Sequence, residues 1–282
     1  MSMPSELYPV VSNIDNCWLQ IGASFPKRVA VFVDSPENYD KYKDYDIKIL
    51  LAVEPTELWG SNEALKKCAK DFDIIMAWDE ELLKLPNARL YLQPYTAYWI
   101  DVLNYNVWNK HYSVSTVVGA KSQTIGHKMR HELYLRQNEI EIPKRFFVSS
   151  ALPIPNKFNN PYLGKSKEPL FDSMFHICIE NVGRRKNSIT EKLVDCLVTG
   201  TVPIHWGCTN LSDYFDPRGI LVAKDVDDII NICNQLTPEM YYDMKLYIDN
   251  NKRNGLKYFD IRLSVIKEIK SLLKEKYGIC SF

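Results

Sequence analysis

The stretch from Phe175 to Gly207, FHICIENVGRRKNSITEKLVDCLVTGTVPIHWG, predicts a strand, a polar loop, a helix and a second strand. Thr190 is placed to cap the helix, because its hydroxyl can accept hydrogen bonds from the free amides of the first turn. Gly200 is placed to end it, since the left-handed conformation that ends many helices favours glycine. A helix that begins beside the carboxyl end of a strand offers unpaired amides and a partial positive charge, which suit a phosphate or diphosphate.

Basic residues fill the loop before the predicted helix. The loop carries Arg184, Arg185 and Lys186, and Lys192 lies just inside the helix. An ordinary strand-helix-strand unit with solvated charges would have a similar composition. The density of polar residues between two core-like runs favours a binding site, because binding groups concentrate on loops held by rigid scaffolds. The predicted ligand is anionic.

The composition is that of a globular chain without net charge. Its 282 residues, 46% of them hydrophobic, can bury a large core and predict one large or two modest domains, of which we favour two. Lys+Arg and Asp+Glu each number 35, so neither a large basic surface nor a nucleic-acid partner is expected. The N-terminus lacks a basic segment followed by an apolar one, and no apolar run approaches the ~18 residues of a membrane span. We therefore expect a cytoplasmic protein without a membrane span.

The cysteines predict reduced thiols that fill the core. No CxxC pair and no Cys/His cluster has the spacing of zinc ligands, and an odd number of scattered cysteines is typical of a reducing compartment. The seven positions are Cys17, Cys68, Cys178, Cys196, Cys208, Cys233 and Cys280.

Apolar runs that alternate with helical patterns indicate an α/β protein. Residues 28–35 (RVAVFVDS) and 47–53 (IKILLAV) are typical of strands buried on both faces of a parallel sheet. A second series begins at Tyr112, and the tail from Pro238 to Leu273 predicts two helical stretches. We expect two domains, residues 1–105 and 106–282.

Three acidic residues stand where predicted strands of the first domain end. Glu54 follows the strand at 47–53, and Asp79 and Glu80 follow a predicted strand at 72–78. In open α/β sheets ligands bind beyond the carboxyl ends of the strands. Each of the three therefore lies where a ligand is expected, and Glu54 could instead cap a turn before Pro55.

The order of residues around Thr190 resembles the donor-binding motif of the alpha-1,3-fucosyltransferases. That motif runs Glu-Asn, a short polar loop, Tyr-x-Thr-Glu-Lys, a helix, and Val/Ile-Pro-Ile-Tyr-Trp-Gly. This chain has Glu180-Asn181, then Thr190-Glu191-Lys192, then residues 202–207 (VPIHWG). Upstream, residues 117–130 (VVGAKSQTIGHKMR) resemble a family segment that ends on a helical arginine, here Arg130. Residues 53–55 (VEP) and 78–82 (WDEEL) resemble two short N-terminal motifs, the first of which contains the proposed catalytic glutamate.

The resemblance implies a fold of the glycosyltransferase-B type, with two Rossmann-like lobes and C-terminal helices. It implies a nucleotide-sugar donor in the C-terminal lobe, a glycan acceptor over the N-terminal lobe, and inverting transfer in the cleft. Arg130 and Lys192 would bind the donor diphosphate, and Glu191 would accept hydrogen bonds from its ribose. Glu54 would be the general base, with Asp79 and Glu80 as alternatives. The implied donor-binding residues are Arg130, Glu180, Asn181, Arg185, Ser188, Thr190, Glu191 and Lys192.

The chain departs from the family motif at two tyrosines, which are Ser188 and His205 here. The donor therefore stays open between GDP-fucose and UDP-xylose. In its length the chain also looks like the compact soluble glycosyltransferases of large algal viruses, which build capsid glycans and some of which transfer xylose. That likeness would place the protein in the host cytoplasm.

We expect no metal and no cofactor besides the donor substrate. Three Asp-x-Asp pairs, at residues 44–46, 71–73 and 225–227, imitate the acidic pair of metal-dependent glycosyltransferases. Arginine, lysine and a helix terminus can hold a diphosphate without a metal. The alternative function is a non-catalytic nucleotide-sugar or carbohydrate-binding protein of the same fold.

Overall fold

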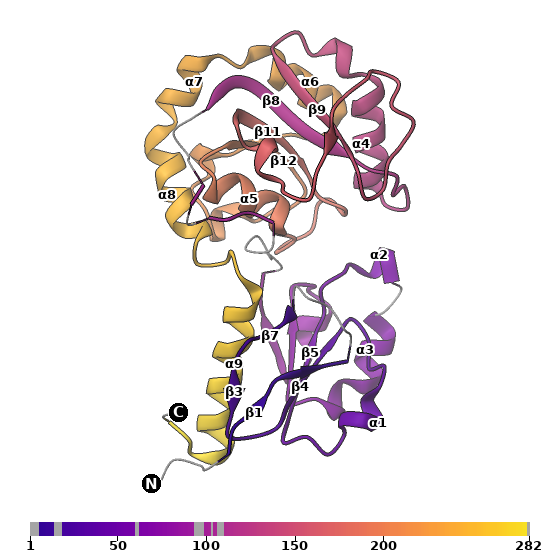
Figure 1. Ribbon diagram of the computed structural model, residues 1–282, viewed down its shortest axis with the longest axis vertical. Helices are drawn as coiled ribbons and strands as arrows, with labels where there is room; N and C mark the ends of the chain where they lie inside the picture. Colours follow the sequence, from indigo (N-terminus) through magenta and orange to yellow (C-terminus); the bar gives the residue numbers. More distant parts are fainter. Residues whose placement is uncertain are drawn as a thin grey trace. The chain divides into compact units, whose positions relative to one another are not determined.

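The computed structural model describes residues 6–13, 19–59, 62–92, 99–102, 104–105 and 110–280. The chain divides into two compact units, which Figure 1 shows. The amino-terminal unit combines Met1–Gln93 with Asp260–Phe282, and the carboxy-terminal unit is Pro94–Phe259. This differs from the expected division into 1–105 and 106–282, because the last helix packs with the amino-terminal unit.

A five-stranded parallel sheet forms the centre of the amino-terminal unit. Its central strands are buried, as their continuous apolar runs predict. The order is β2 (Val11–Ser12), β4 (Val29–Val33), β5 (Ile47–Leu51), β6 (Ile74–Ala77) and β7 (Ala88–Leu90). A separate antiparallel pair consists of β1 (Tyr8–Pro9) and β3 (Ser24–Phe25), and the helices are α1 (Tyr39–Tyr42), α2 (Thr56–Trp59) and α3 (Asn62–Cys68).

Helix α9 (Ile261–Tyr277) returns to the amino-terminal unit at the end of the chain. Lys276 donates to Asp73, the hydroxyl of Tyr277 donates to the Asp46 carbonyl at 3.0 Å, and the Lys27 ammonium lies over the Tyr277 ring. The sequence predicts two helical stretches in the tail. The structure corrects this to three helices, because α7 (Pro238–Asp243) ends before α8 (Lys245–Gly255) begins.

A six-stranded parallel sheet forms the centre of the carboxy-terminal unit. The strand order is β10 (Tyr162–Leu163), β9 (Lys144–Ser149), β8 (His111–Val118), β11 (Ser173–Ile179), β12 (Val202–Trp206) and β13 (Leu221–Val222). The other helices are α4 (Ile125–Leu135), α5 (Glu191–Val198) and α6 (Val226–Gln235). Helix α4 contacts β8, β11 and α6, and α5 contacts α8. Two parallel sheets confirm the predicted α/β fold class.

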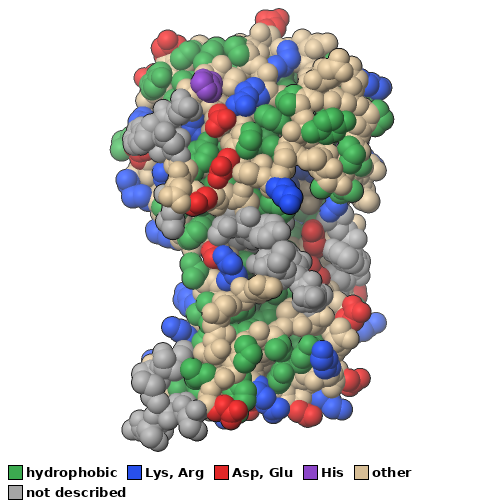
Figure 2. Space-filling model, viewed as in Figure 1, with side chains coloured by type: hydrophobic (Ala, Val, Ile, Leu, Met, Phe, Trp, Pro, Cys, Tyr) green, Lys and Arg blue, Asp and Glu red, His purple; other side chains and the backbone are tan. Residues whose placement is uncertain are grey.

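The surface carries both signs of charge. On the face in Figure 2, lysine and arginine side chains are interspersed with acidic ones. Such mixing does not make the single-sign surface that favours nucleic acid. Among the residues that the structure describes, no helix is both long enough and apolar enough to cross a membrane.

We predict that Gly126→Ala destabilises the protein. A Cβ on Gly126 would meet the Glu180 carbonyl oxygen and lie 2.9 Å from that of Asn181, so α4 would have to move away from the end of β11. The higher helix propensity of alanine, worth about 1 kcal/mol, offsets part of an overpacking cost of about 1–3 kcal/mol. Backbone carbonyl oxygens cannot move aside as a flexible side chain would, so the overpacking cost should lie near its upper end and urea unfolding should show a net loss of about 2 kcal/mol.

Gly164→Ala is the matched control for this prediction. A Cβ on Gly164 would have no heavy atom within 4 Å, so its stability should stay within about 0.5 kcal/mol of the wild type. Equal stability of the two variants would contradict the close approach of α4 to β11.

Candidate donor-binding site

The start of α5 is held by a buried carboxylate. The Thr190 hydroxyl caps the helix by accepting from the Lys192 amide, as the sequence predicts. The same hydroxyl donates to Glu180 Oε2 at 2.7 Å, and the Thr190 amide donates to Oε1 at 3.2 Å. Glu180 follows directly after β11 and has no exposed surface. The Glu180 carboxylate thus joins the end of β11 to the first turn of α5.

Alternating charges line this first turn. Lys192 Nζ lies 3.3 Å from Glu191 Oε1 and 3.8 Å from Glu180 Oε2. Lys167 Nζ lies 3.3 Å from both Glu191 Oε1 and Asp195 Oδ2, from the segment before β11. The side chains of Lys167 and Lys192 keep 19% and 26% of their surface exposed, whereas those of the acids are nearly buried. The cations therefore form the accessible side of the cluster.

The pKa values follow from burial and from these charges. Burial acts to raise the pKa of Glu191, but Lys192 and Lys167 outweigh it and lower that pKa to about 2. Burial raises the pKa of Glu180, although Lys192 acts against the rise. Burial acts to lower the pKa of Lys192, but the Glu191 and Glu180 charges raise it overall. Glu191 and Lys192 are thus both ionised at neutral pH.

Arg130 reaches the same strand end from α4. Its guanidinium donates to the Ile179 carbonyl and, at 2.8 Å, to Asn181 Oδ1. The Gly126 amide donates to the Asn181 carbonyl at 3.1 Å, so the first turn of α4 also contacts this strand end. A guanidinium carries five N–H donors, so these two bonds fix its orientation and leave capacity for an anion. The structure therefore brings Arg130, Glu180, Asn181, Thr190, Glu191 and Lys192 together, in one unit of the chain.

The remaining donor-site candidates lie in the loop between β11 and α5. Ser188 is buried, with 2% of its surface exposed. The Arg185 backbone forms a parallel bridge with Cys208, and its carbonyl accepts from the Thr209 amide at 3.1 Å. This places the Arg185 backbone beside the segment after β12. Both residues stay predicted donor contacts.

His205 belongs to a buried hydrogen-bonded group. Its Nε2 accepts from the Cys208 amide at 3.0 Å, and its Nδ1 lies 3.5 Å from Cys178 Sγ. Among the described residues, Cys178, Glu180 and His205 are the group whose ligand atoms come close enough for a metal ion. Both Glu180 oxygens accept hydrogen bonds from Thr190, and His205 Nε2 accepts one from the Cys208 amide. The group thus resembles a satisfied polar core.

One aspartate of each Asp-x-Asp pair accepts a hydrogen bond from a backbone amide. Asp46 accepts from the Arg28 amide, Asp73 accepts from the Lys48 amide, and Asp225 caps α6. Metal independence stays a prediction.

Glu54, Asp79 and Glu80 lie at neighbouring strand ends in the amino-terminal unit. Asp79 accepts from the Glu81 amide at 2.9 Å and thereby caps a turn, and Glu80 is exposed. Glu54 is half-buried, and its amide donates to the Asp34 carboxylate at 3.0 Å. Of the three candidate bases, Glu54 has its backbone held by a second carboxylate.

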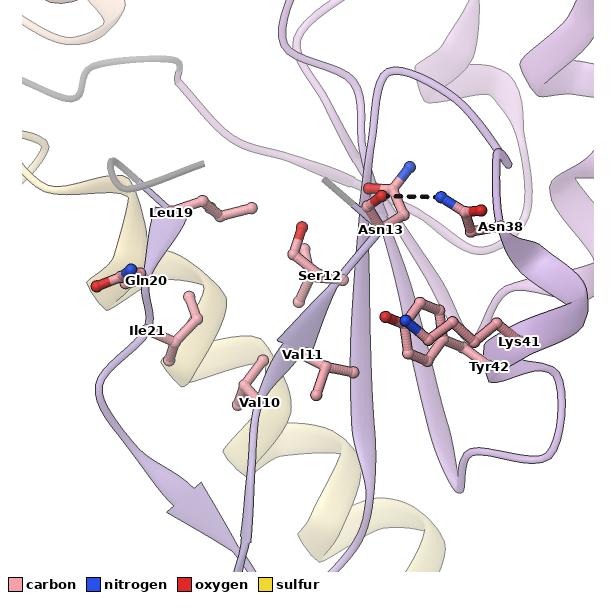
Figure 3. Close-up of a pocket in the computed structure, with 11 residues that line it drawn as sticks. Val10, Val11, Ser12, Asn13, Leu19, Gln20, Ile21, Asn38, Lys41 and Tyr42 are labelled. Atoms are coloured by element: carbon pink, nitrogen blue, oxygen red, sulfur yellow. Dashed lines mark hydrogen bonds between the residues drawn. The ribbon is translucent and has the colours of Figure 1, made fainter. Parts of the chain in front are cut away.

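A cavity of about 460 Å³ lies beside β2 in the amino-terminal unit. Figure 3 shows Val11, Asn13, Asn38, Lys41 and Tyr42 around it, with Asn38 donating to the Asn13 carbonyl. Asn13 also accepts from the Val33 amide at 2.9 Å. The cavity therefore adjoins the carboxyl end of β4.

Comparison with solved structures identifies the architecture. An alpha1,3-fucosyltransferase solved with GDP-fucose matches over 93% of each chain, at a TM-score of 0.54 and 16% identity. TarM matches over 88% of this chain and 55% of its own, at a TM-score of 0.57 and 10% identity. The chain has the glycosyltransferase-B fold. The glycosyltransferase-B arrangement of two Rossmann-like units with C-terminal helices is the one that the sequence predicts.

Sequence comparison covers about half of this glycosyltransferase-B chain. The alpha-(1,3)-fucosyltransferase FucT of Helicobacter pylori is 28% identical over 145 residues, which are 49% of this chain and 29% of that enzyme. The chain thus matches less than a third of the length of this relative. No family model matches the chain.

The structure adds two residues that the sequence does not single out. Lys167 lies 24 residues before Glu191 in the chain yet contacts it, and Asp34 holds the Glu54 amide. Neither belongs to a motif. A lysine in a proline-rich loop and an aspartate before Ser-Pro are both ordinary on sequence grounds.

We predict that Lys167→Met destabilises the protein by about 3 kcal/mol, because Glu191 and Asp195 are nearly buried and would lose a shared cation. Urea unfolding near neutral pH would measure the loss. Lys165→Met, on an exposed neighbour, is the matched control and should stay within about 0.5 kcal/mol.

The pH dependence tests the same contact. The pKa of Glu191 is lower in the folded protein than its ordinary value of 4.5, so ionised Glu191 stabilises the fold above pH 4.5. This stabilisation is lost as the pH falls toward about 2. The wild type should therefore lose stability over this window, and Lys167→Met should lose less. An unchanged slope would contradict the role of Lys167.

Proposed function

We propose that the protein is an inverting, metal-independent glycosyltransferase that moves a sugar from a nucleoside diphosphate to a glycan hydroxyl. The observation that carries the proposal is the cluster of Arg130, Glu191 and Lys192 at the end of β11 and the start of α5. These residues follow the order of the fucosyltransferase motif. The fold and the partial sequence similarity to FucT support the same class of reaction.

The cluster suits a diphosphate leaving group. When the sugar leaves, negative charge develops on the diphosphate, and preorganised cations stabilise that charge. Arg130 offers a planar fork of donors and Lys192 a point charge, while hydrogen bonds and carboxylates already fix both. Glu191, ionised and acceptor-only, suits the hydroxyls of the donor ribose.

Glu54 is our proposed general base. In an inverting transfer the acceptor oxygen attacks the anomeric carbon, the bond to the diphosphate breaks, and the hydroxyl proton passes to a carboxylate. Glu54 is half-buried at a strand end, whereas Asp79 caps a turn and Glu80 is exposed. This contrast supports Glu54 over the two alternatives.

The donor is GDP-fucose in our proposal, with UDP-xylose as the alternative. A solved fucosyltransferase of the same fold contains GDP-fucose. Ser188 stands where the family motif has tyrosine, so the contact near the donor differs. A viral source and a role in capsid glycans stay predictions, as does the cytoplasmic location.

The acceptor is proposed to bind the amino-terminal unit. The cavity beside β2 combines apolar side chains with Asn13, Asn38 and Lys41. Apolar surface with a few polar groups is typical of small-ligand sites. Asn13 connects this cavity to the end of β4, since it accepts from the Val33 amide and donates to the Ser35 carbonyl.

We predict that GDP raises the melting temperature more than UDP does. A ligand that binds only the folded state stabilises it by RT ln(1 + [L]/Kd), about 2.7 kcal/mol at a hundredfold excess over Kd. Arg130→Lys should weaken GDP binding by about tenfold or more, because lysine cannot form the bidentate contact.

Lys128→Ala is the control, since Lys128 is exposed on the same helix and should leave GDP binding unchanged. Stabilisation by UDP alone would redirect the donor to UDP-xylose. If neither nucleotide stabilised the protein, the proposed function would be wrong.

We predict that Glu54→Gln lowers the transfer rate by about 100-fold or more and leaves GDP binding unchanged, because glutamine cannot accept the acceptor proton. A transfer assay and calorimetry would measure the two quantities. Proton NMR of the wild-type product should show an inverted anomeric centre, and a retained centre would exclude Glu54 as the base.

Asp79→Asn and Glu80→Gln are the matched controls, with near wild-type transfer expected. Loss of transfer in either control, with Glu54→Gln active, would move the base to that residue. Nucleotide binding without turnover by the wild type would support the alternative, a non-catalytic nucleotide-sugar or carbohydrate-binding protein.

A further inference from the structure

Asp34 connects the carboxyl ends of β4 and β5. Its carboxylate Oδ1 accepts from the Val53 amide at 2.6 Å and from the Glu54 amide at 3.0 Å. Its own amide donates to the Leu51 carbonyl at 2.9 Å. Three hydrogen bonds therefore join one aspartate to the segment that presents Glu54.

The backbone of Asp34 is adapted to this task. Its φ of 55° lies in the left-handed region, which aspartate and asparagine adopt more readily than most residues. Asp34 follows directly after β4, and the two amides that its carboxylate binds lie shortly after β5. The conformation turns the carboxylate back to the neighbouring strand end.

Other contacts hold the segment just before Glu54. Trp78 Nε1 donates to the Val53 carbonyl at 3.2 Å, and the Tyr91 hydroxyl donates to the Ala52 carbonyl at 2.8 Å. These bonds fix Ala52 and Val53. The Asp34 carboxylate extends this support to the backbone of Glu54.

The setting of Asp34 is also unusual for an aspartate. Burial raises the pKa of Asp34 to about 7; the hydrogen bonds from the Glu54 and Val53 amides oppose the rise, and the Glu54 charge adds to it. Carboxyl groups that are desolvated and lie beside a second carboxylate occur most often at functional sites.

We propose that Asp34 is a positioning residue, which fixes the backbone of Glu54 so that the Glu54 carboxylate meets the acceptor hydroxyl. The inference rests on the proposed function, in which Glu54 is the base. Asp34 acts through Glu54 and takes no proton from the acceptor. Removing it frees the Glu54 backbone, and misplacing a reacting group by about 1 Å can lower a rate about 100-fold.

Two substitutions of Asp34 test this role: one removes the side chain that accepts the hydrogen bonds, and the other keeps an acceptor oxygen. Asp34→Gly removes the acceptor oxygen but tolerates the left-handed φ, so the fold is not strained. Asp34→Asn keeps an oxygen that can accept from both amides and also tolerates this φ. We expect Asp34→Gly to lower kcat about 100-fold with GDP binding unchanged, and Asp34→Asn to restore kcat to within about tenfold of the wild type.

Asn159→Gly controls for the loss of a left-handed residue elsewhere, because Asn159 has a φ of 53° in the carboxy-terminal unit. It should keep wild-type kcat. Thermal unfolding of all three variants would identify any loss of folded protein, and rates would be expressed per folded molecule.

The double variant Asp34→Gly, Glu54→Gln decides whether Asp34 acts through Glu54. Residues that act as a unit are not additive, so the double variant should be no slower than Glu54→Gln alone. A further loss beyond Glu54→Gln would overturn the inference. So would wild-type kcat in Asp34→Gly while Glu54→Gln is inactive. If Glu54→Gln itself kept transfer, the proposed base would fail first, and the two failures are therefore distinguishable.

Discussion

The hydrogen bonds from Thr190 to the Glu180 carboxylate are the contact on which the candidate donor site depends. Glu180 is fully buried, and a buried carboxylate is tolerated only when it is hydrogen-bonded or paired. Its two oxygens bind the amide and the hydroxyl of the residue that caps α5. One side chain thereby closes the loop of residues 181–189 at both ends. The position of Lys192, two residues after Thr190, follows from this closure.

Neighbouring carboxylates explain how several cations can lie close together before a ligand binds. Arg130, Lys167 and Lys192 would repel if they were left alone in a partly buried site. Glu191 lies between the two lysines at 3.3 Å from each, and its pKa of about 2 keeps it ionised at any physiological pH. The acids are nearly buried while the lysines keep exposed surface. The lysines therefore form a fixed cationic surface above buried acidic side chains, and such a surface suits an anion that arrives from solvent.

The regular fold could be predicted from the sequence because apolar runs specify it. The strands β4, β5, β6, β8, β11 and β12 lie where such runs predict them, and Thr190 and Gly200 bound α5 as expected. The two-residue strands β1, β2, β3 and β10 were missed, since two residues carry no period. The sequence also does not predict which of the two units α9 packs against. An amphipathic pattern shows that a helix has a buried face but not which unit covers it.

The site divides in the same way between local pattern and tertiary contact. The motif around Thr190 is local and could be predicted, whereas Lys167 and Asp34 act on residues that the fold brings to them. The two departures from the family motif also separate once their surroundings are known. His205 is absorbed into the core, because its two ring nitrogens face Cys178 and the Cys208 amide. These two contacts explain why histidine is found at position 205. Ser188 is therefore the departure that stays a predicted change in donor contact, since it shortens a side chain within the loop that Glu180 and Thr190 close.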